Sequence, residues 1–251
     1  MKTSQEWITY FNTNLQEKRI DWSQAPAITK EELKAVLKSL QAWQLGETSE
    51  GKNLIKASEK YAAKHGDVLY VDAIKLFIKE EQKHGNNLGR YLDAIGQARI
   101  KKNWGDTLFR KIRYLNASME MWTIAVITVE SAAQIFYQAL KDATQCSLLK
   151  EICTDILIDE APHIKFQQER LARIFNAKTM AGMAISYYGY KFFYKVTSLV
   201  VWLAHKKLFK AGGIDFKKYY KKMNMKLEKT VGRLKYGTNE NEFVPSYRPT
   251  I

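Results

Sequence analysis

Apolar residues recur at intervals of three and four along four long stretches of this chain, the spacing that gathers them on one face of an α-helix. The first stretch opens at a Thr29–Glu32 capping box and runs to Gly66, and the second ends near Gly96. The third and fourth stretches follow a longer connection around Trp104. Four amphipathic helices of this kind predict an all-α protein built on a four-helix bundle.

Composition divides the chain into four parts. Residues 1–28 hold several aromatic side chains and predict a strap that packs on the bundle. The bundle is expected over residues 29–175, and basic, aromatic-rich C-terminal helices are expected over residues 176–236. The end of the chain, residues 237–251, contains two prolines and predicts an irregular tail.

Acidic residues and histidines lie on the apolar stripes, whereas solvated side chains would fall on the opposite face. Glu81 and His84 share a face of the second helix, and Glu160 and His163 repeat this spacing on the fourth. Glu130 is the acid on the apolar stripe of the third helix. Two facing Glu-x-x-His helices, with one further Glu from each of the other two, form the ligand set of a carboxylate-bridged dimetal site.

The first helix offers two candidates for the remaining ligand, Glu47 and Glu50, which both lie on its apolar face. Four carboxylates and two neutral imidazoles would offset most of the charge of two divalent ions. Without metal, the four inward carboxylates would repel one another and be costly to bury. The sequence therefore predicts a metal-loaded centre.

Two further acids, Glu80 and Asp159, directly precede the glutamates of the two Glu-x-x-His motifs. They could orient His84 and His163 across the bundle, because a metal-bound imidazole needs an acceptor at its outer nitrogen. The alternative is that both are surface acids.

The combined pattern resembles the ferritin-like di-iron carboxylate superfamily over roughly residues 30–175. The segment Gln44–Glu50, which reads Gln-Leu-Gly-Glu-Thr-Ser-Glu, is similar to the Gly-Glu segment in the first helix of rubrerythrins and aldehyde-deformylating oxygenases. This resemblance favours Glu47 as the ligand and leaves Glu50 as a supporting residue beside the metals.

Two more segments carry the resemblance. Glu130 followed seven residues later by Tyr137 is similar to the third helix of the deformylating oxygenases, and Asp159 precedes Glu160 as in the Asp-Glu-x-x-His form of the motif. Ala133 stands where rubrerythrins carry an additional Glu, which argues against their peroxidase chemistry.

The resemblance implies a non-haem di-iron oxygenase or oxidase that activates O₂ to oxidise a small, largely apolar substrate, with acyl compounds and aldehydes as candidates. Its cofactor would be two iron ions, with manganese as the alternative. Tyr137 would take part in redox chemistry beside the metals, or would be an ordinary core tyrosine with its hydroxyl bonded. An external donor, a reductase or ferredoxin, would supply electrons.

Two other functions use the same ligands. A ferroxidase, iron-handling or peroxide-scavenging protein would form a cage or dimer and take up more iron than the centre itself holds. An RNA-modifying di-iron hydroxylase would give the basic C-terminal third a nucleic-acid partner and would bind RNA with steep salt dependence.

Positive charge is concentrated in the C-terminal third. Residues 176–236 contain 14 Lys and Arg against two acids, in a chain with a formal net charge of +14. The segment 185–226 is interpreted as helices packed on the bundle, with contact to an anionic membrane surface as an alternative. Nucleic-acid binding is disfavoured, because no recognised motif accompanies the charge.

The N-terminal sequence lacks a basic region followed by an apolar core, so no signal peptide is expected. The chain is interpreted as cytoplasmic, with attachment to the periphery of a membrane as an alternative. The sequence does not determine the oligomeric state, and an oligomer is compatible with it.

Overall fold

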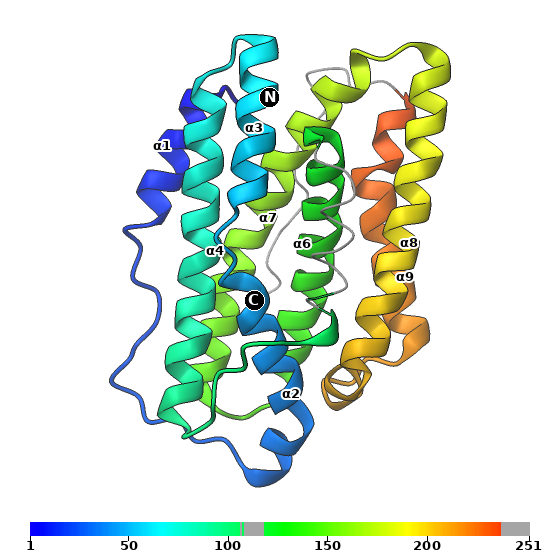
Figure 1. The fold of residues 1–251 in the computed structure, drawn as a ribbon. Helices are drawn as coiled ribbons and strands as arrows, with labels where there is room; N and C mark the ends of the chain where they lie inside the picture. The colour runs from blue at the N-terminus through cyan, green and yellow to red at the C-terminus, as the bar shows by residue number, and fades with distance from the viewer. Residues whose placement is uncertain (106, 108–117, 237–251) are drawn as a thin grey trace.

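The computed structural model describes residues 1–105, 107 and 118–236, and this part of the chain is helical without strands (Figure 1). The tail predicted for residues 237–251 lies outside the described residues. The helices are α1 (Ser4–Asn14), α2 (Lys30–Glu47), α3 (Lys52–His65), α4 (Leu69–Ala94), α6 (Met119–Asp142), α7 (Ser147–Asn176), α8 (Met180–Ala211), α9 (Phe216–Thr230) and the 3-10 helix η1 (Gly232–Tyr236).

The bundle consists of α4, α6, α7 and the pair α2 and α3, which follow one another along the same edge (Figure 1). α6 packs along α7, while α4 contacts α2, α3 and α7. Two apolar clusters fill the interior. The larger includes Tyr137 and the smaller includes Phe77, whose ring lies 4.9 Å from that of His163. The polar centre described below therefore lies between two apolar cores.

The prediction of one continuous helix from Thr29 to Gly66 is wrong. α2 ends at Glu47 and α3 begins after Gly51, which has a left-handed φ of 64°. A Cβ on Gly51 would collide with the side chain of Ile78, so packing as well as backbone conformation requires glycine here. The break makes Glu47 the last residue of its helix.

The remaining helices cover two sides of the bundle. α1 packs on α4, and Trp7 Nε1 donates a 2.8 Å hydrogen bond to Glu169 on α7. α8 packs on α6 and α2, and α9 packs on α8 and α6 (Figure 1). Among the described residues, one helix, α6, is long and apolar enough to cross a membrane. Of its apolar 18-residue segment, 78% is buried within the bundle.

Candidate metal centre

The six predicted ligands come from four helices and meet inside the bundle. His84, Glu160 and His163 are completely buried, and Glu130 is 5% exposed. The i, i+3 spacing on α4 and on α7 puts each carboxylate on the same inward face as its imidazole. The contributions are Glu47 from α2, Glu81 and His84 from α4, Glu130 from α6, and Glu160 and His163 from α7.

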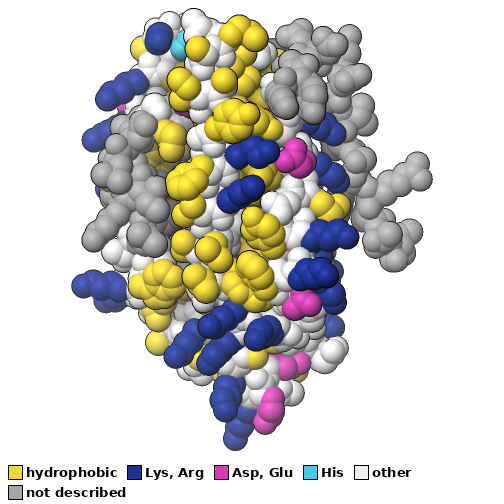
Figure 2. Space-filling model, turned by 90° about the vertical axis from the view of Figure 1, so that its right-hand side faces the viewer, with side chains coloured by type: hydrophobic (Ala, Val, Ile, Leu, Met, Phe, Trp, Pro, Cys, Tyr) yellow, Lys and Arg dark blue, Asp and Glu magenta, His cyan; other side chains and the backbone are white. Residues whose placement is uncertain are grey.

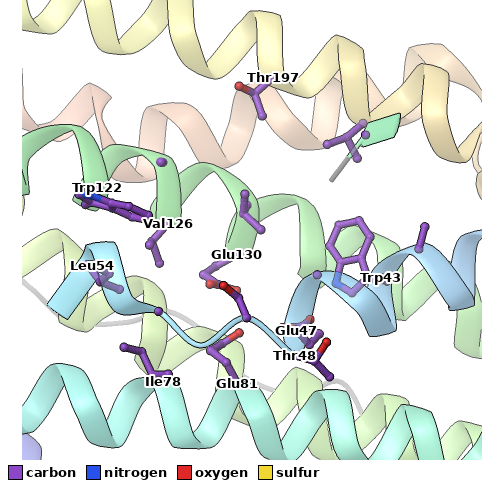
Figure 3. Close-up of a pocket in the computed structure, with 18 of the residues that line it drawn as sticks. Trp43, Glu47, Thr48, Leu54, Ile78, Glu81, Trp122, Val126, Glu130 and Thr197 are labelled. Atoms are coloured by element: carbon purple, nitrogen blue, oxygen red, sulfur yellow. The ribbon is translucent and has the colours of Figure 1, made fainter. Parts of the chain in front are cut away.

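The ligand atoms form two overlapping groups that share Glu81. One group is Glu47, Glu81 and His84, and the other is Glu81, Glu130 and His163; within each, one ligand atom per residue lies within 4.8 Å of the others. Figure 3 shows the carboxylates of Glu47, Glu81 and Glu130 directed toward one another from three helices. If each group held one cation, Glu81 would be the carboxylate within reach of both.

Glu160 adds a fourth carboxylate whose oxygens both lack a hydrogen-bond partner among the described residues. Its Oε2 lies 4.0 Å from Nδ1 of His163. Within the same described part of the chain, Nδ1 of His84 also lacks a hydrogen-bond partner, and Nδ1 of His163 lies 2.7 Å from Glu81 Oε1 without the alignment of a hydrogen bond. A buried polar atom left unpaired costs about 1–3 kcal/mol. The unpaired carboxylate oxygens and imidazole nitrogens fit two transition-metal cations.

The outer nitrogen of each imidazole is held by a carboxylate from the opposite helix. His84 Nε2 on α4 lies 3.0 Å from Asp159 Oδ2 on α7, and His163 Nε2 on α7 lies 2.6 Å from Glu80 Oε2 on α4. Both acids are completely buried, so the structure places them inside the bundle and not at its surface. This arrangement fixes each ring with Nδ1 facing the other ligands and makes that nitrogen more basic.

Three residues that the sequence did not single out hold these carboxylates in place: one of them bonds to both, and the other two bond to Asp159 and not to Glu80. Asn14, at the end of α1, donates from Nδ2 to Glu80 and, over 2.8 Å, to Asp159. Arg19 donates to Asp159 over 2.8 Å, and Lys83 Nζ does so over 3.2 Å. From the sequence, these partners could be expected only in general terms, because a buried carboxylate needs hydrogen-bond or charge partners.

On the first helix, the structure brings Glu47 to the centre and leaves Glu50 outside it. The Tyr137 hydroxyl donates a 2.7 Å hydrogen bond to Glu47 Oε1. The Glu50 side chain is 70% exposed and pairs with Lys52. The expectation that Glu50 supports the ligands is wrong, because the helix ends before it and the linker turns its side chain to solvent.

Burial and crowding shift the pKa values of Glu47, Glu130 and Glu160 upward. Burial and the neighbouring Glu81 raise the pKa of Glu47 to about 8. Burial and Glu130 raise the pKa of Glu160 well above its ordinary value. Burial opposes charge on His163, but Glu81 and Glu80 together outweigh it, and the pKa of this imidazole is well above its ordinary value. The metal-free centre therefore holds protons that bound cations would displace.

A cavity of about 410 Å³ adjoins the centre and reaches α8. Figure 3 shows Trp43 on one side of the carboxylates. On the other side lie Leu54, Ile78, Trp122 and Val126. On the α8 wall, Thr197 and His205 add polar groups; His205 Nδ1 lies 3.1 Å from Ser39 Oγ, and burial lowers the pKa of His205 to about 4. The imidazole of His205 is therefore neutral at pH 7. The apolar walls include Trp43, Leu54, Ile78, Trp122, Val126 and Val200.

Comparison with known proteins gives a match in structure alone. No model of a protein family matches the sequence, and no curated protein matches it. A variant of an R2-like ligand-binding oxidase with an aerobically reconstituted Mn/Fe cofactor matches with a TM-score of 0.66 at 17% identity, over 92% of this chain and 93% of that chain. A second variant, with an anaerobically reconstituted Mn/Fe cofactor, matches with a TM-score of 0.64 at 17% identity, over 94% of each chain.

The chain has a ferritin-like fold. The predicted all-α, ferritin-like bundle with additional C-terminal helices is thereby confirmed. These ferritin-like neighbours are R2-like oxidases, and the likeness to rubrerythrins and deformylating oxygenases rests on sequence segments alone. The neighbours carry two different metals, and the donor set of this chain also suits a two-metal cofactor.

Proposed function

We propose that this protein is a non-haem dimetal oxidase that oxidises a small apolar molecule bound in the cavity beside the metal centre. The observation that carries the proposal is that Glu47, Glu81 and Glu130 belong both to the ligand groups and to the cavity wall. The volume of about 410 Å³ falls within the range, roughly 300–1,000 Å³, in which proteins hold small organic ligands. The ligand-binding oxidases of the same fold are consistent with this function.

Six side chains would hold the two metals, either two irons or manganese with iron. Such a centre, once reduced, supplies electrons for reaction with O₂. Asp159 and Glu80 keep the imidazoles oriented, and Tyr137 stabilises one orientation of the Glu47 carboxylate through its hydrogen bond. The apolar walls keep water from the substrate. An external reductase or ferredoxin would restore the reduced state. The six are Glu47, Glu81, His84, Glu130, Glu160 and His163.

The cavity favours a substrate with an alkyl chain and an oxygen-bearing head group, such as an acyl compound or an aldehyde. Its walls are apolar over most of their length, with carboxylates at the metal centre, polar side chains among residues 48–53, and Thr197 and His205 on α8. An alkyl chain against the apolar walls would gain about 25 cal/mol for each Å² of surface removed from water. These polar regions offer places for a head group.

The test is to fill the cavity without touching a ligand. Val126 lines it, so Val126→Phe should weaken binding of a fluorescent fatty acid by about tenfold or more while metal content stays unchanged. Val68→Phe is the matched control, because Val68 is 70% exposed and lies outside the cavity. Substrate-dependent uptake of dissolved O₂ by the reduced, metal-loaded protein should fall in parallel.

A different outcome would favour iron handling. Iron uptake far beyond the capacity of one centre, unaffected by Val126→Phe, would contradict the oxidase proposal. So would O₂ uptake that proceeds equally with the cavity filled.

A further inference from the structure

α8 has an apolar stripe on its solvent-exposed face. Six side chains follow one another at intervals of three or four residues, so they lie along one side of the helix for about 27 Å. Figure 2 shows this side of the molecule, with hydrophobic side chains running along its length. The stripe consists of Ile185 (75% exposed), Tyr188 (70%), Phe192 (71%), Val196 (44%), Leu199 (45%) and Leu203 (53%).

The opposite side of α8 is apolar too, and that side supplies the packing on the bundle. Tyr190, Tyr194 and Trp202 are almost completely buried. The exposed stripe therefore does not take part in the packing of α8 on the bundle. A contiguous exposed apolar patch of this length marks a site of interaction with a protein or a membrane.

Lysines continue the stripe and border it. Lys206, Lys207 and Lys210 are exposed and lie on the same side of the helix beyond Leu203. Lys195 flanks the stripe midway, and α8 contains no Asp or Glu. In Figure 2 the basic side chains gather toward one end of the hydrophobic run.

α9 adds to the positive charge of this side. Residues 180–230, which cover α8 and α9, hold eleven lysines and two acids, a net charge of +9. Phe216 and Met225 on α9 are exposed as well, at 44% and 52%. Exposed apolar and cationic groups are thus combined on these two neighbouring helices.

We propose that this surface, the α8 stripe with its lysines, binds an anionic lipid bilayer, with α8 lying along the membrane plane. A helix in that position buries its apolar side chains at the boundary between head groups and acyl chains, while lysines contact anionic head groups. The helix lies on the membrane and does not span it, because its other side is packed on α6 and α2.

The charge pattern favours lipid over other partners. A second copy of this chain would bring two lysine-rich helices together, and α8 has no acid with which to neutralise them. A nucleic acid would neutralise the lysines but would leave Phe192 and its apolar neighbours without an apolar partner. An anionic bilayer satisfies both kinds of side chain.

Val196 connects this surface with the cavity. Its side chain is 44% exposed on the stripe and also lines the cavity that reaches the metal centre. If the proposed oxidase function holds, an alkyl substrate could pass from the bilayer into the cavity beside α8. Membrane binding itself does not depend on that function.

The proposal is tested by sedimenting the full-length protein with vesicles of phosphatidylcholine alone and of phosphatidylcholine mixed with phosphatidylglycerol. The wild type should bind the anionic vesicles, bind the neutral ones much more weakly, and dissociate as salt rises. Lys206→Gln with Lys210→Gln should weaken binding about 25-fold, at roughly fivefold per lysine. Phe192→Ser with Leu199→Ser should weaken it by about tenfold or more.

Matched controls lie on other helices. Lys60→Gln with Lys64→Gln removes two exposed lysines from α3, and Val68→Ser with Leu69→Ser removes two exposed apolar side chains at the N-terminal end of α4. Both should bind anionic vesicles like the wild type, and all variants should keep the wild-type helix content because they change exposed side chains. Metal-free and metal-loaded protein should bind equally, which separates this result from the oxidase proposal.

Three results would overturn the proposal. One is absence of wild-type binding to anionic vesicles, and another is an equal loss in the control variants. The third is a dimer or an RNA complex that depends on this surface when vesicle binding does not. In that case Phe192→Ser with Leu199→Ser, or the α8 lysine variant, would abolish the complex and leave vesicle binding unchanged.

Discussion

Asp159 on α7 holds the outer nitrogen of His84 on α4 at 3.0 Å, in the buried interior of the bundle. Burial opposes a charge on Asp159, but the hydrogen bond and charge of His84, with the bond from Asn14 and the charge of Lys83, keep its pKa below the ordinary value. The carboxylate therefore stays ionised and fixes the ring of a predicted metal ligand. The same relation joins Glu80 to His163 in the opposite direction across the bundle.

Asp159→Ala should lower the affinity for metal by about 10–100-fold, because His84 loses the acceptor that orients it. Asp159→Asn keeps an acceptor at this position and should retain most of the affinity. Competition with a coloured chelator measures both values. Glu59→Gln, an exposed position on α3, is the control. Equal affinities for wild type and Asp159→Ala would show that His84 is not a ligand.

Glu47→Gln should remove metal from the group that contains His84, whereas Glu50→Gln should leave metal content unchanged. The two positions are three residues apart, but Glu47 faces Glu81 and the Glu50 side chain is 70% exposed. Metal analysis of the two purified variants makes the comparison. Loss of metal in Glu50→Gln and retention in Glu47→Gln would reverse the assignment of the helix ligand.

The metal-free protein should become less stable as pH rises from about 5 to about 8. Glu47 has a pKa of about 8 in the folded chain against an ordinary 4.5, so the folded state binds more protons than the unfolded state in this interval. The raised pKa of His163 acts in the same direction, because its stabilising contribution is lost as pH rises through the folded-state pKa. Thermal unfolding at several pH values measures the slope.

Bound metal should reverse this dependence of stability on pH. Binding requires deprotonated ligands, so it should release protons, and the affinity should increase with pH. Calorimetric titrations in buffers of different ionisation enthalpy count the protons. Glu47→Gln removes one titrating group and should flatten the slope of the metal-free protein; an unchanged slope would contradict the role of Glu47.

Tyr137→Phe should reduce the free energy of unfolding by about 1–2 kcal/mol, because it deletes a hydrogen bond to a carboxyl group inside the protein. The pKa of Glu47 should rise further, since the bond from Tyr137 lowers it. Denaturant titration measures the stability, with Tyr188→Phe at an exposed position as control. A loss no larger than that of the control would show that the bond contributes nothing to stability.

The helical period was sufficient to predict which candidate ligands face inward. Glu81 with His84, and Glu160 with His163, are separated by three residues, and this local spacing fixes their common face wherever the helix packs. The apolar stripe then identifies that face as the interior. Glu130 follows from the same argument on α6.

Features that depend on contacts between distant segments could not be predicted this way. Asn14 and Asp159 are 145 residues apart, and no local pattern connects them. The break before α3 was missed because the apolar period continues on both sides of it, while Gly51 is required by its packing against Ile78. On α8 both sides are apolar, so the period does not reveal that Phe192 is exposed.

The number of metal ions bound per chain tests the account most directly. Protein loaded with iron, or with manganese and iron, and freed of excess metal should contain about two ions per chain by elemental analysis. Glu160→Gln should reduce this number, and Glu50→Gln should not. A wild-type protein that binds no metal, or one ion that Glu160→Gln does not affect, would contradict the assignment of a dimetal centre to these six side chains.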